Sequence, residues 1–150
     1  MDFKYYCKKF WHFIWEEDSL LSLIVNIILA YVLIKFLVYP GLGFILNTTH
    51  PIVAVVSGSM EHDGSFNQWW ESQQEWYSKK NISKENFLSF PFKNGFNKGD
   101  IMILKKIKTE NMKKGDVIVF WSDRSDPIIH RVVDIYNNNN NTFFQTKGDH

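Results

Sequence analysis

The sequence predicts a small, mostly β domain, partly barrel-like, with one N-terminal transmembrane helix and an aromatic-rich insertion. Three observations predict this arrangement. One long apolar run lies near the N-terminus, short β-branched runs separated by turn residues fill the second half, and no helix of a dozen residues is indicated after Ile101. The length of 150 residues allows one ordinary domain, and the apolar fraction of 45% excludes a disordered chain.

Charge and cysteine content exclude several function classes. The net charge of +1 gives no electrostatic reason to expect a nucleic-acid partner. The single cysteine, Cys7, excludes an intrachain disulfide and a zinc site made of four cysteines. We therefore expect no metal, no cofactor and no nucleic acid.

The apolar run from Leu20 to Tyr39 predicts the transmembrane helix. Fourteen of its residues are Leu, Ile, Val or Phe, and twenty helical residues span about 30 Å, the thickness of a bilayer core. Their insertion free energy of about −6 kcal/mol outweighs the roughly 3 kcal/mol that Lys35 would cost at the centre, and Lys35 lies near the end, where it can snorkel. A buried helix of a soluble protein is the alternative, but the rest of the chain offers little to cover a helix that is apolar on every side.

Basic residues predict how this helix is oriented. Lys4, Lys8 and Lys9 precede the run, and no Lys or Arg occurs between Lys35 and Lys79. The positive-inside rule then gives a cytoplasmic segment 1–18, an anchor 19–46 and an extracytoplasmic domain 47–150. Aromatic residues before the run suit the membrane interface. No Ala-x-Ala site follows the run, so we expect an uncleaved anchor.

Short β-branched runs predict the strands of the domain. They lie at 51–56, 101–104, 117–120, 128–133 and 142–146. Lys-Gly-Asp precedes two of them, at 98–100 and 114–116, where Gly supplies a turn and Asp can bond the local backbone.

The segment from about 62 to 97 is a predicted insertion with a helix around 66–79. It is rich in aromatic residues among polar ones. These aromatic side chains could pack on the β core or rest at the membrane interface, and the sequence leaves both readings open. Glycosylation patterns begin at Asn47, Asn81 and Asn140, although such matches arise easily in an Asn-rich chain.

Three side chains could together carry out nucleophilic catalysis. Ser59 lies in Ser57-Gly58-Ser59-Met60, directly after the first strand, where a hydroxyl and backbone N–H groups can be exposed. His130, in the fourth strand, could serve as its base, and Asp149 could orient that base. Taken singly, each has a plainer interpretation: an ordinary Ser-Gly-Ser turn, a hydrogen-bonded core or surface histidine, and a third Lys-Gly-Asp strand-entry turn. The histidine could instead be served by Asp100, Asp116, Asp126 or Asp134.

The local sequences around these residues resemble the boxes of type I signal peptidases. Residues 55–61, Val-Val-Ser-Gly-Ser-Met-Glu, are similar to the nucleophile box, and residues 114–120 to the strand that follows it. Residues 129–133, Ile-His-Arg-Val-Val, resemble the general-base box of the archaeal and endoplasmic-reticulum branch (the Ser-His type), in which His replaces the bacterial Lys. Residues 146–149, Thr-Lys-Gly-Asp, resemble its acidic box. His62 stands where the family usually has Pro, and His150 where it usually has Asn.

The resemblance implies a membrane-bound serine endopeptidase that removes signal peptides from secretory preproteins after small residues. It implies Ser59 as nucleophile, His130 as general base, Asp149 as the acid that orients or stabilises His130, Ser57 as an aid to the oxyanion hole and Met60 as part of the substrate pocket. The bilayer and secretory preproteins would be its partners, with any secretion-machinery partner unknown. An inactive relative that binds signal peptides without cleaving them is the alternative. A soluble self-cleaving repressor-like peptidase fits less well, because such proteins use a Lys base.

Overall fold

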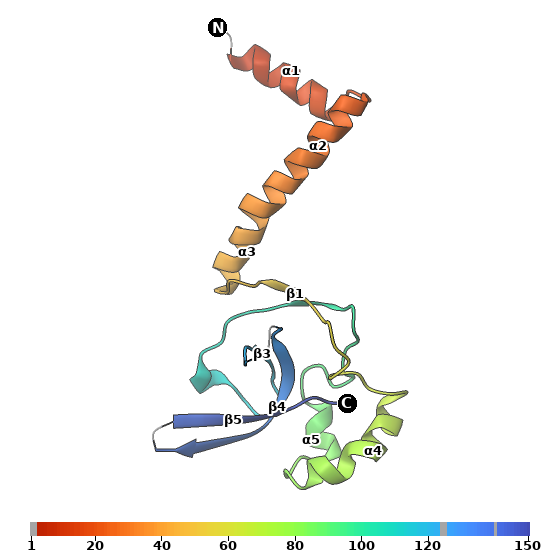
Figure 1. Cartoon of the computed structure of the whole chain (residues 1–150), viewed down its shortest axis with the longest axis vertical. Coiled ribbons are helices and arrows are strands. Elements are labelled where there is room, and N and C mark those ends of the chain that lie inside the picture. Colours follow the sequence, from red (N-terminus) through yellow and green to blue (C-terminus); the bar gives the residue numbers. More distant parts are fainter. Residues whose placement is uncertain (1–2, 124–125, 140) are drawn as a thin grey trace. The chain divides into compact units, whose positions relative to one another are not determined.

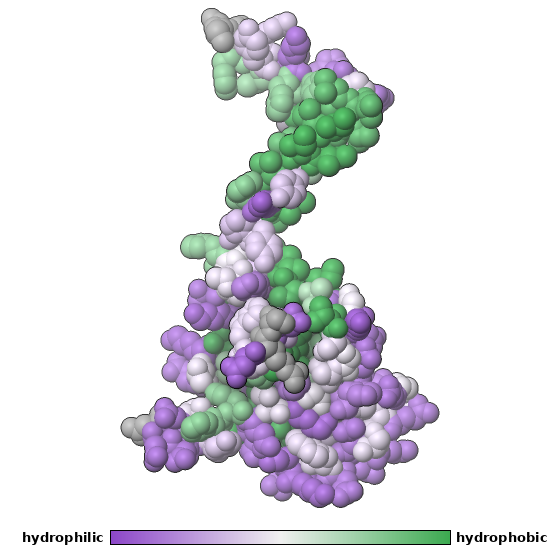
Figure 2. All heavy atoms as spheres, in the orientation of Figure 1, coloured by the Kyte–Doolittle hydropathy of each residue, from purple (hydrophilic) through white to green (hydrophobic). Residues whose placement is uncertain are grey.

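The computed structural model describes residues 3–123, 126–139 and 141–150, and it divides into two compact units, Met1–Pro51 and Ile52–His150. The first unit is helical (Figure 1), with α1 at Phe3–Trp15, α2 at Leu20–Leu33, a π-helical turn at Ile34–Val38 and α3 at Tyr39–Leu46. Leu20–Leu46 forms one helix of 27 residues with a mean hydropathy of 2.5, and within the described residues it alone is long and apolar enough to cross a membrane. In Figure 2 hydrophobic residues cover the upper turns of this helix, and paler and more hydrophilic residues lie along its lower turns.

Pro40 explains why the helix widens before its last turns. Proline has no N–H to donate and its ring clashes with the carbonyl four residues earlier. The preceding turn is π-helical, and the Tyr39 N–H donates to the Ile34 carbonyl, five residues back. This register shift accommodates the proline within one continuous helix.

The second unit contains two small antiparallel sheets. In one, β1 (Ile52–Ala54) pairs with β2 (Ile101–Ile103). In the other, the order is β3 (Val117–Phe120), β4 (Ile128–Asn138) and β5 (Asn141–Lys147), with a β-bulge in β4 between Val132 and Asp134. All five predicted strands are therefore present, although the first is shorter than expected.

The predicted insertion folds into two helices, α4 at Phe66–Ser78 and α5 at Lys84–Leu88. Each begins with a serine capping box, in which a serine hydroxyl and the side chain three residues later exchange hydrogen bonds with the backbone. The helices bury an aromatic cluster against Val133 of β4. Its buried members are Trp69, Trp70, Tyr77, Ile82, Phe87 and Val133. Of the two readings of the insertion, packing on the β core is therefore confirmed for these aromatic residues.

The predicted fold class holds only in part. Helices contain more residues than strands across the chain, and no barrel closes among the strands of the described residues. After β2 the one described helix is a 3₁₀ turn at Thr109–Asn111, as expected. Asn47 and Asn81 are exposed, and Asn140 lies outside the described residues.

The first two Lys-Gly-Asp segments form the same turn. Gly99 and Gly115 both have a φ of +98°, a conformation that L side chains rarely adopt. In each turn the aspartate side chain accepts a hydrogen bond of 2.8 Å from the backbone N–H three residues earlier. The turns are confirmed as strand entries, and the carboxylates of Asp100 and Asp116 are engaged in them.

We predict that Gly115→Ala destabilises the protein more than Gly99→Ala does. The two glycines share one φ, so alanine brings a similar backbone strain at both, on the order of 1 kcal/mol. At Gly115 the added methyl group would also overlap the Phe90 ring, whereas at Gly99 nothing lies within 4 Å. Overpacking adds about 1–3 kcal/mol. Thermal unfolding of the detergent-solubilised variants measures the difference, and equal losses would contradict the predicted role of the Phe90 contact.

Candidate functional site

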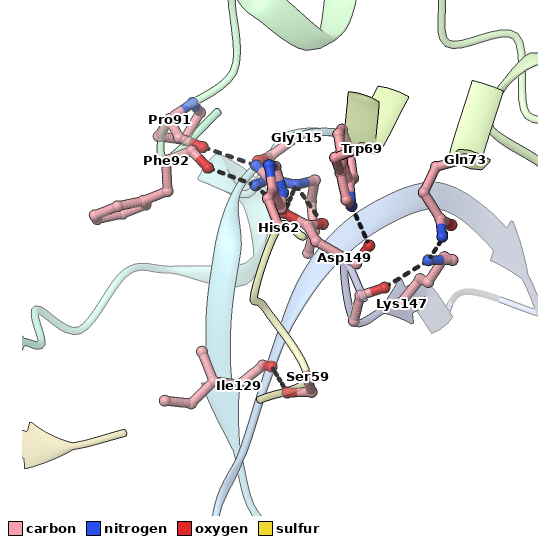
Figure 3. A network of polar contacts seen from close by, with 12 residues as sticks. Ser59, His62, Trp69, Gln73, Pro91, Phe92, Gly115, Ile129, Lys147 and Asp149 are labelled. Atoms are coloured by element: carbon pink, nitrogen blue, oxygen red, sulfur yellow. Dashed lines mark hydrogen bonds and ion pairs between the residues drawn. The ribbon is translucent and has the colours of Figure 1, made fainter. Parts of the chain in front are cut away.

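Ser59 lies in a turn directly after β1. Buried Val55 continues the pairing of the two-stranded sheet, because its N–H donates to the Asp100 carbonyl at 2.9 Å and its carbonyl accepts from the Gly99 N–H at 2.9 Å. The chain then turns, and the Ser59 hydroxyl lies 3.3 Å from the Ser57 hydroxyl and 3.5 Å from the Ile129 carbonyl of β4. Figure 3 shows Ser59 beside Ile129. The half-buried Ser59 hydroxyl therefore lies next to β4, the strand that carries His130.

Glu61 fixes the shape of this turn. Its N–H donates to the Gly58 carbonyl at 3.0 Å, and its carboxylate accepts from the Lys98 N–H at 2.9 Å. A Cβ on Gly58 would lie only 2.8 Å from the same carboxylate, so a larger residue there would have to displace the Glu61 side chain. The loop that carries Ser59 is thus tied to the first Lys-Gly-Asp turn rather than hanging free at a strand end.

His130 lies on β4, opposite Ile118 of β3, and its ring meets that of Phe120 edge-on at 6.3 Å. Gly148, just after β5, connects it with the serine. A Cβ placed on Gly148 would lie 3.2 Å from the Ser59 Cβ and 3.3 Å from the His130 Nε2. Ser59 and His130, 71 positions apart by their numbers, therefore border the same small space, and only a glycine leaves that space open.

Asp149 is fully buried and lies in a network of its own (Figure 3). Its carboxylate accepts hydrogen bonds from Arg131 Nε at 3.0 Å and Nη2 at 2.6 Å, and from the Tyr77 hydroxyl at 3.0 Å. His62 Nε2 lies 3.2 Å from the same carboxylate, and the indole of Trp69 donates to the Asp149 carbonyl at 2.8 Å. The third Lys-Gly-Asp is therefore not a strand-entry turn, and its aspartate joins β4 to the insertion.

Arg131 completes the network. It follows His130 in β4, so its side chain lies on the face of the strand opposite to that of His130. The guanidinium donates to the carbonyls of Pro91 at 2.7 Å, Gly115 at 2.9 Å and Phe92 at 2.9 Å, and it stacks over the Phe87 ring at 4.7 Å. A buried charge is costly unless it is paired and hydrogen-bonded throughout. Here carbonyls and a carboxylate surround the guanidinium, so the pair is fully satisfied.

The surroundings shift the pKa values of the Tyr77 hydroxyl and of the Asp149 carboxyl. Burial raises the pKa of Tyr77 far above its ordinary value, so its hydroxyl stays protonated and donates. Burial alone would also raise the pKa of Asp149, but hydrogen bonds from His62, Arg131 and Tyr77 and the positive charge of Arg131 outweigh it and hold this pKa below its ordinary value. Asp149 is accordingly a buried carboxylate, not a carboxylic acid.

From the sequence, His62 stands out only as a departure from the family pattern, and neither Arg131 nor Tyr77 stands out as part of the site. The His62 ring stacks on Trp69 with centroids 3.6 Å apart, and its side chain is 3% exposed. Within the part of the chain that the structure describes, its Nδ1 has no hydrogen-bond partner. The signal for Arg131 was available, because a charged residue inside an apolar strand needs a buried partner.

The other candidate acids are engaged elsewhere or exposed. Asp134 lies 3.8 Å from Lys80 and 3.9 Å from Lys114. Asp126 is exposed and lines a cavity of about 80 Å³ beside Ser59. That cavity is also lined by Val53, Ala54, Val55, Val56, Ser57, Ser59, Phe96, Pro127 and Ile129. Met60 is buried with Val55 and Phe96, so it lies behind the cavity wall. No group of metal-ligating side chains occurs among the described residues.

Comparison with known proteins returns signal peptidases. The catalytic subunit SEC11 of the signal peptidase complex from Scheffersomyces stipitis is 31% identical over 123 residues, which are 81% of this chain and 54% of that protein. SEC11C from Canis lupus familiaris is 26% identical over 115 residues, 75% of this chain and 43% of that protein. Signal peptidase I W from Bacillus subtilis is 36% identical over 66 residues, 43% of this chain and 35% of that protein.

These relatives are peptidases by name, and the SEC11 proteins match most of the chain. These matches, at about 30% identity over most of the chain, support a type I signal peptidase of the endoplasmic-reticulum and archaeal-like branch. The chain spans about half the length of the SEC11 proteins that it matches. No protein-family model matches it, and no solved structure does.

We predict that Tyr77→Phe destabilises the protein by about 1.5–3 kcal/mol, because the change removes a hydrogen bond to a buried carboxylate and leaves the ring packing in place. The matched control is Tyr136→Phe, at a tyrosine that is 54% exposed, where we expect a change within about 0.5 kcal/mol. Thermal unfolding compares the two variants. Similar small effects of both would mean that the Tyr77 hydroxyl does not hold Asp149.

We further predict that Asp149 makes the protein sensitive to acid. A carboxyl whose folded-state pKa is lowered stabilises the fold above its ordinary pKa, and this stability is lost as the pH falls through the lowered value. The unfolding temperature of the wild type should therefore drop between about pH 5 and about pH 3. Asp149→Asn should be less stable near neutral pH and show a flatter profile over this interval. Asp134→Asn, at a partly exposed carboxylate, should keep the wild-type slope.

Proposed function

We propose that this protein is a membrane-bound serine endopeptidase that removes N-terminal signal peptides from secretory preproteins, cutting after small residues. One observation carries the proposal. Ser59 and His130, which belong to different boxes of the family, border the same space at Gly148. The matches to signal peptidases over most of the chain support the reaction class.

In the proposed mechanism, the Ser59 hydroxyl attacks the scissile carbonyl carbon while His130 accepts its proton. An imidazole can do this near neutral pH. The oxyanion that forms would be stabilised by the Ser59 N–H and by the Ser57 hydroxyl, which lies 3.3 Å from the Ser59 hydroxyl. When the C–N bond breaks, His130 returns the proton to the leaving amine. It then deprotonates the water that hydrolyses the acyl-enzyme.

Asp149 would act through the backbone. Its carboxylate holds Arg131, the residue after His130, and its own neighbour Gly148 lies against both Ser59 and His130. The Arg131–Asp149 pair would thus fix β4 and the segment after β5 relative to each other. In this proposal Asp149 is a positioning residue.

The cavity beside Ser59 supports the expected preference for small residues. Its volume of about 80 Å³ suits a small side chain, and its wall includes β1 residues followed by Ser57 and Ser59. A substrate could add to the edge of β1 as an extended strand, which would bring its carbonyl carbon toward Ser59. Met60, buried behind Val55, would support the pocket from its core side.

The apolar helix Leu20–Leu46 would anchor the enzyme, with the N-terminus in the cytoplasm and the site on the other side of a cell or endoplasmic reticulum membrane. Signal peptides end their own span at this level, so an anchored site would meet the cleavage point. The bilayer and secretory preproteins are then the proposed partners.

We predict that Ser59→Ala and His130→Ala each abolish cleavage of a preprotein, with losses on the order of 10⁴-fold or more, because the two side chains act as one unit. The measurement is appearance of the mature product from detergent-solubilised enzyme. Ser78→Ala, at an exposed serine that ends α4, is the matched control and should cleave normally. Cleavage by Ser59→Ala would exclude the nucleophile. If the wild type binds the preprotein but does not cut it, the protein is the non-cleaving relative instead.

A further inference from the structure

We propose that α1 lies flat in the headgroup–acyl boundary of a phospholipid bilayer, with one face toward the lipid tails, and so forms a second membrane contact beside the apolar helix. The inference rests on the anchor part of the proposed function and does not depend on the peptidase chemistry. It follows from the distribution of side chains on α1, from their exposure, and from the way in which α1 is attached to α2.

Six of the apolar side chains of α1 form one stripe, and Tyr5, Trp11 and Trp15 lie outside it. The six recur at the spacing that places residues on a single face of a helix. These residues are Phe3, Tyr6, Cys7, Phe10, Phe13 and Ile14. Phe3 is 80% exposed and Phe10 is 56% exposed, and α1 has no buried residue. A continuous apolar stripe without a protein cover in the described residues needs another apolar environment.

Cationic side chains lie on the other side of the helix. Lys9 borders the stripe on one flank, and Lys4 follows Trp11 on the other. Between these two lysines lie Lys8 and the polar ring of His12, together with Tyr5 and Trp15. This is the side-chain distribution of a helix that rests in the interface, since ammonium groups on long stems can reach the lipid phosphates. The acidic residues 16–18 follow directly. They offset the lysine charges. We therefore propose that the lysines contact the phosphate groups common to all phospholipids, rather than anionic lipids in particular.

The junction with α2 sets the level of α1. The last carbonyls of a helix have no partner within it. Here the Ser22 hydroxyl donates to the Phe13 carbonyl at 2.7 Å, and the Asn26 amide donates to the Ile14 carbonyl at 3.0 Å. Ser22 and Asn26 are four residues apart on one face of α2, so they hold the end of α1 against the first turns of the apolar helix. If Leu20–Leu46 crosses a bilayer, α1 is therefore held where that helix enters it.

The native sequence supplies a probe for this inference. Cys7, the only cysteine of the chain, lies in the apolar stripe and is exposed. A spin label on Cys7 of the full chain in phosphatidylcholine nanodiscs reports its depth through the relative accessibility to oxygen, which enriches in lipid, and to a nickel chelate, which stays in water. We expect the ratio of oxygen to nickel accessibility to be several-fold higher at Cys7 than at the matched polar-face label, His12→Cys in a Cys7→Ser background.

Two further variants make the result decisive. Phe10→Glu should lower the ratio at Cys7 to that of the His12→Cys label, whereas Tyr5→Glu, on the polar face, should leave it unchanged. Ala30→Cys in the Cys7→Ser background reports whether the apolar helix itself is in the bilayer. If the Ala30→Cys label is buried in lipid but the ratios at Cys7 and His12→Cys are equal, the inference about α1 is wrong and the proposed anchor stands. If the Ala30→Cys label is exposed to water, the proposed anchor is wrong. A Cys7 label that neither reagent reaches would also overturn the inference about α1, because protein would then cover the stripe. Spin–spin broadening of that label would identify the covering protein as a second copy of this chain.

Discussion

The buried ion pair between Arg131 and Asp149 is the contact on which the rest of the second unit depends. Arg131 belongs to the long central strand β4, and Asp149 to the segment after β5. Through its remaining donors, Arg131 also binds the Pro91–Phe92 segment and the Gly115 turn before β3. Four parts of the chain that are distant in sequence therefore meet at one guanidinium. Removing either partner would leave an uncompensated buried charge, which typically costs about 3–5 kcal/mol.

The aromatic insertion provides the surroundings that this pair requires. Tyr77 and Trp69 of α4 donate to Asp149, and the Phe87 ring of α5 covers the guanidinium. An apolar environment strengthens a satisfied pair and penalises an unsatisfied one. The same helices that exclude water also supply the missing donors, so the cluster is both the hydrophobic core of this unit and part of its polar network. The space between Ser59 and His130 is linked to this pair through adjacent residues. Gly148 precedes Asp149, and His130 precedes Arg131.

The sequence predicted the parts of this structure that depend on local interactions. The β-branched runs gave the five strands, and Gly99 and Gly115 gave two turns that need a positive φ. The third Lys-Gly-Asp has the same residues, yet its aspartate is held by Arg131, because a buried cation 18 positions away outweighs the local turn. The pattern also placed Ser59 and His130 correctly on a strand end and a strand, but it did not specify the contact through Gly148. The class prediction failed in part because α1 and α5 add helices that the sequence did not indicate, and because the strands stay in two separate small sheets.

Polar residues in apolar surroundings follow one rule in both units. Asn26 and Lys35 are polar residues within the apolar helix Leu20–Leu46. The structure gives Asn26 the carbonyl of Ile14, and Lys35 the hydroxyl of Tyr31 at 3.0 Å. Arg131 and Asp149 receive a complete set of partners in the same way. Each of these polar groups, once its hydrogen bonds are satisfied, constrains the geometry of the chain. The Asn26 contact fixes where α1 leaves the apolar helix, and the Arg131–Asp149 network fixes which strands face Ser59. A variant that replaced Asn26 with leucine would suit the hydrocarbon better by itself, yet it would leave the Ile14 carbonyl without this partner and release the end of α1.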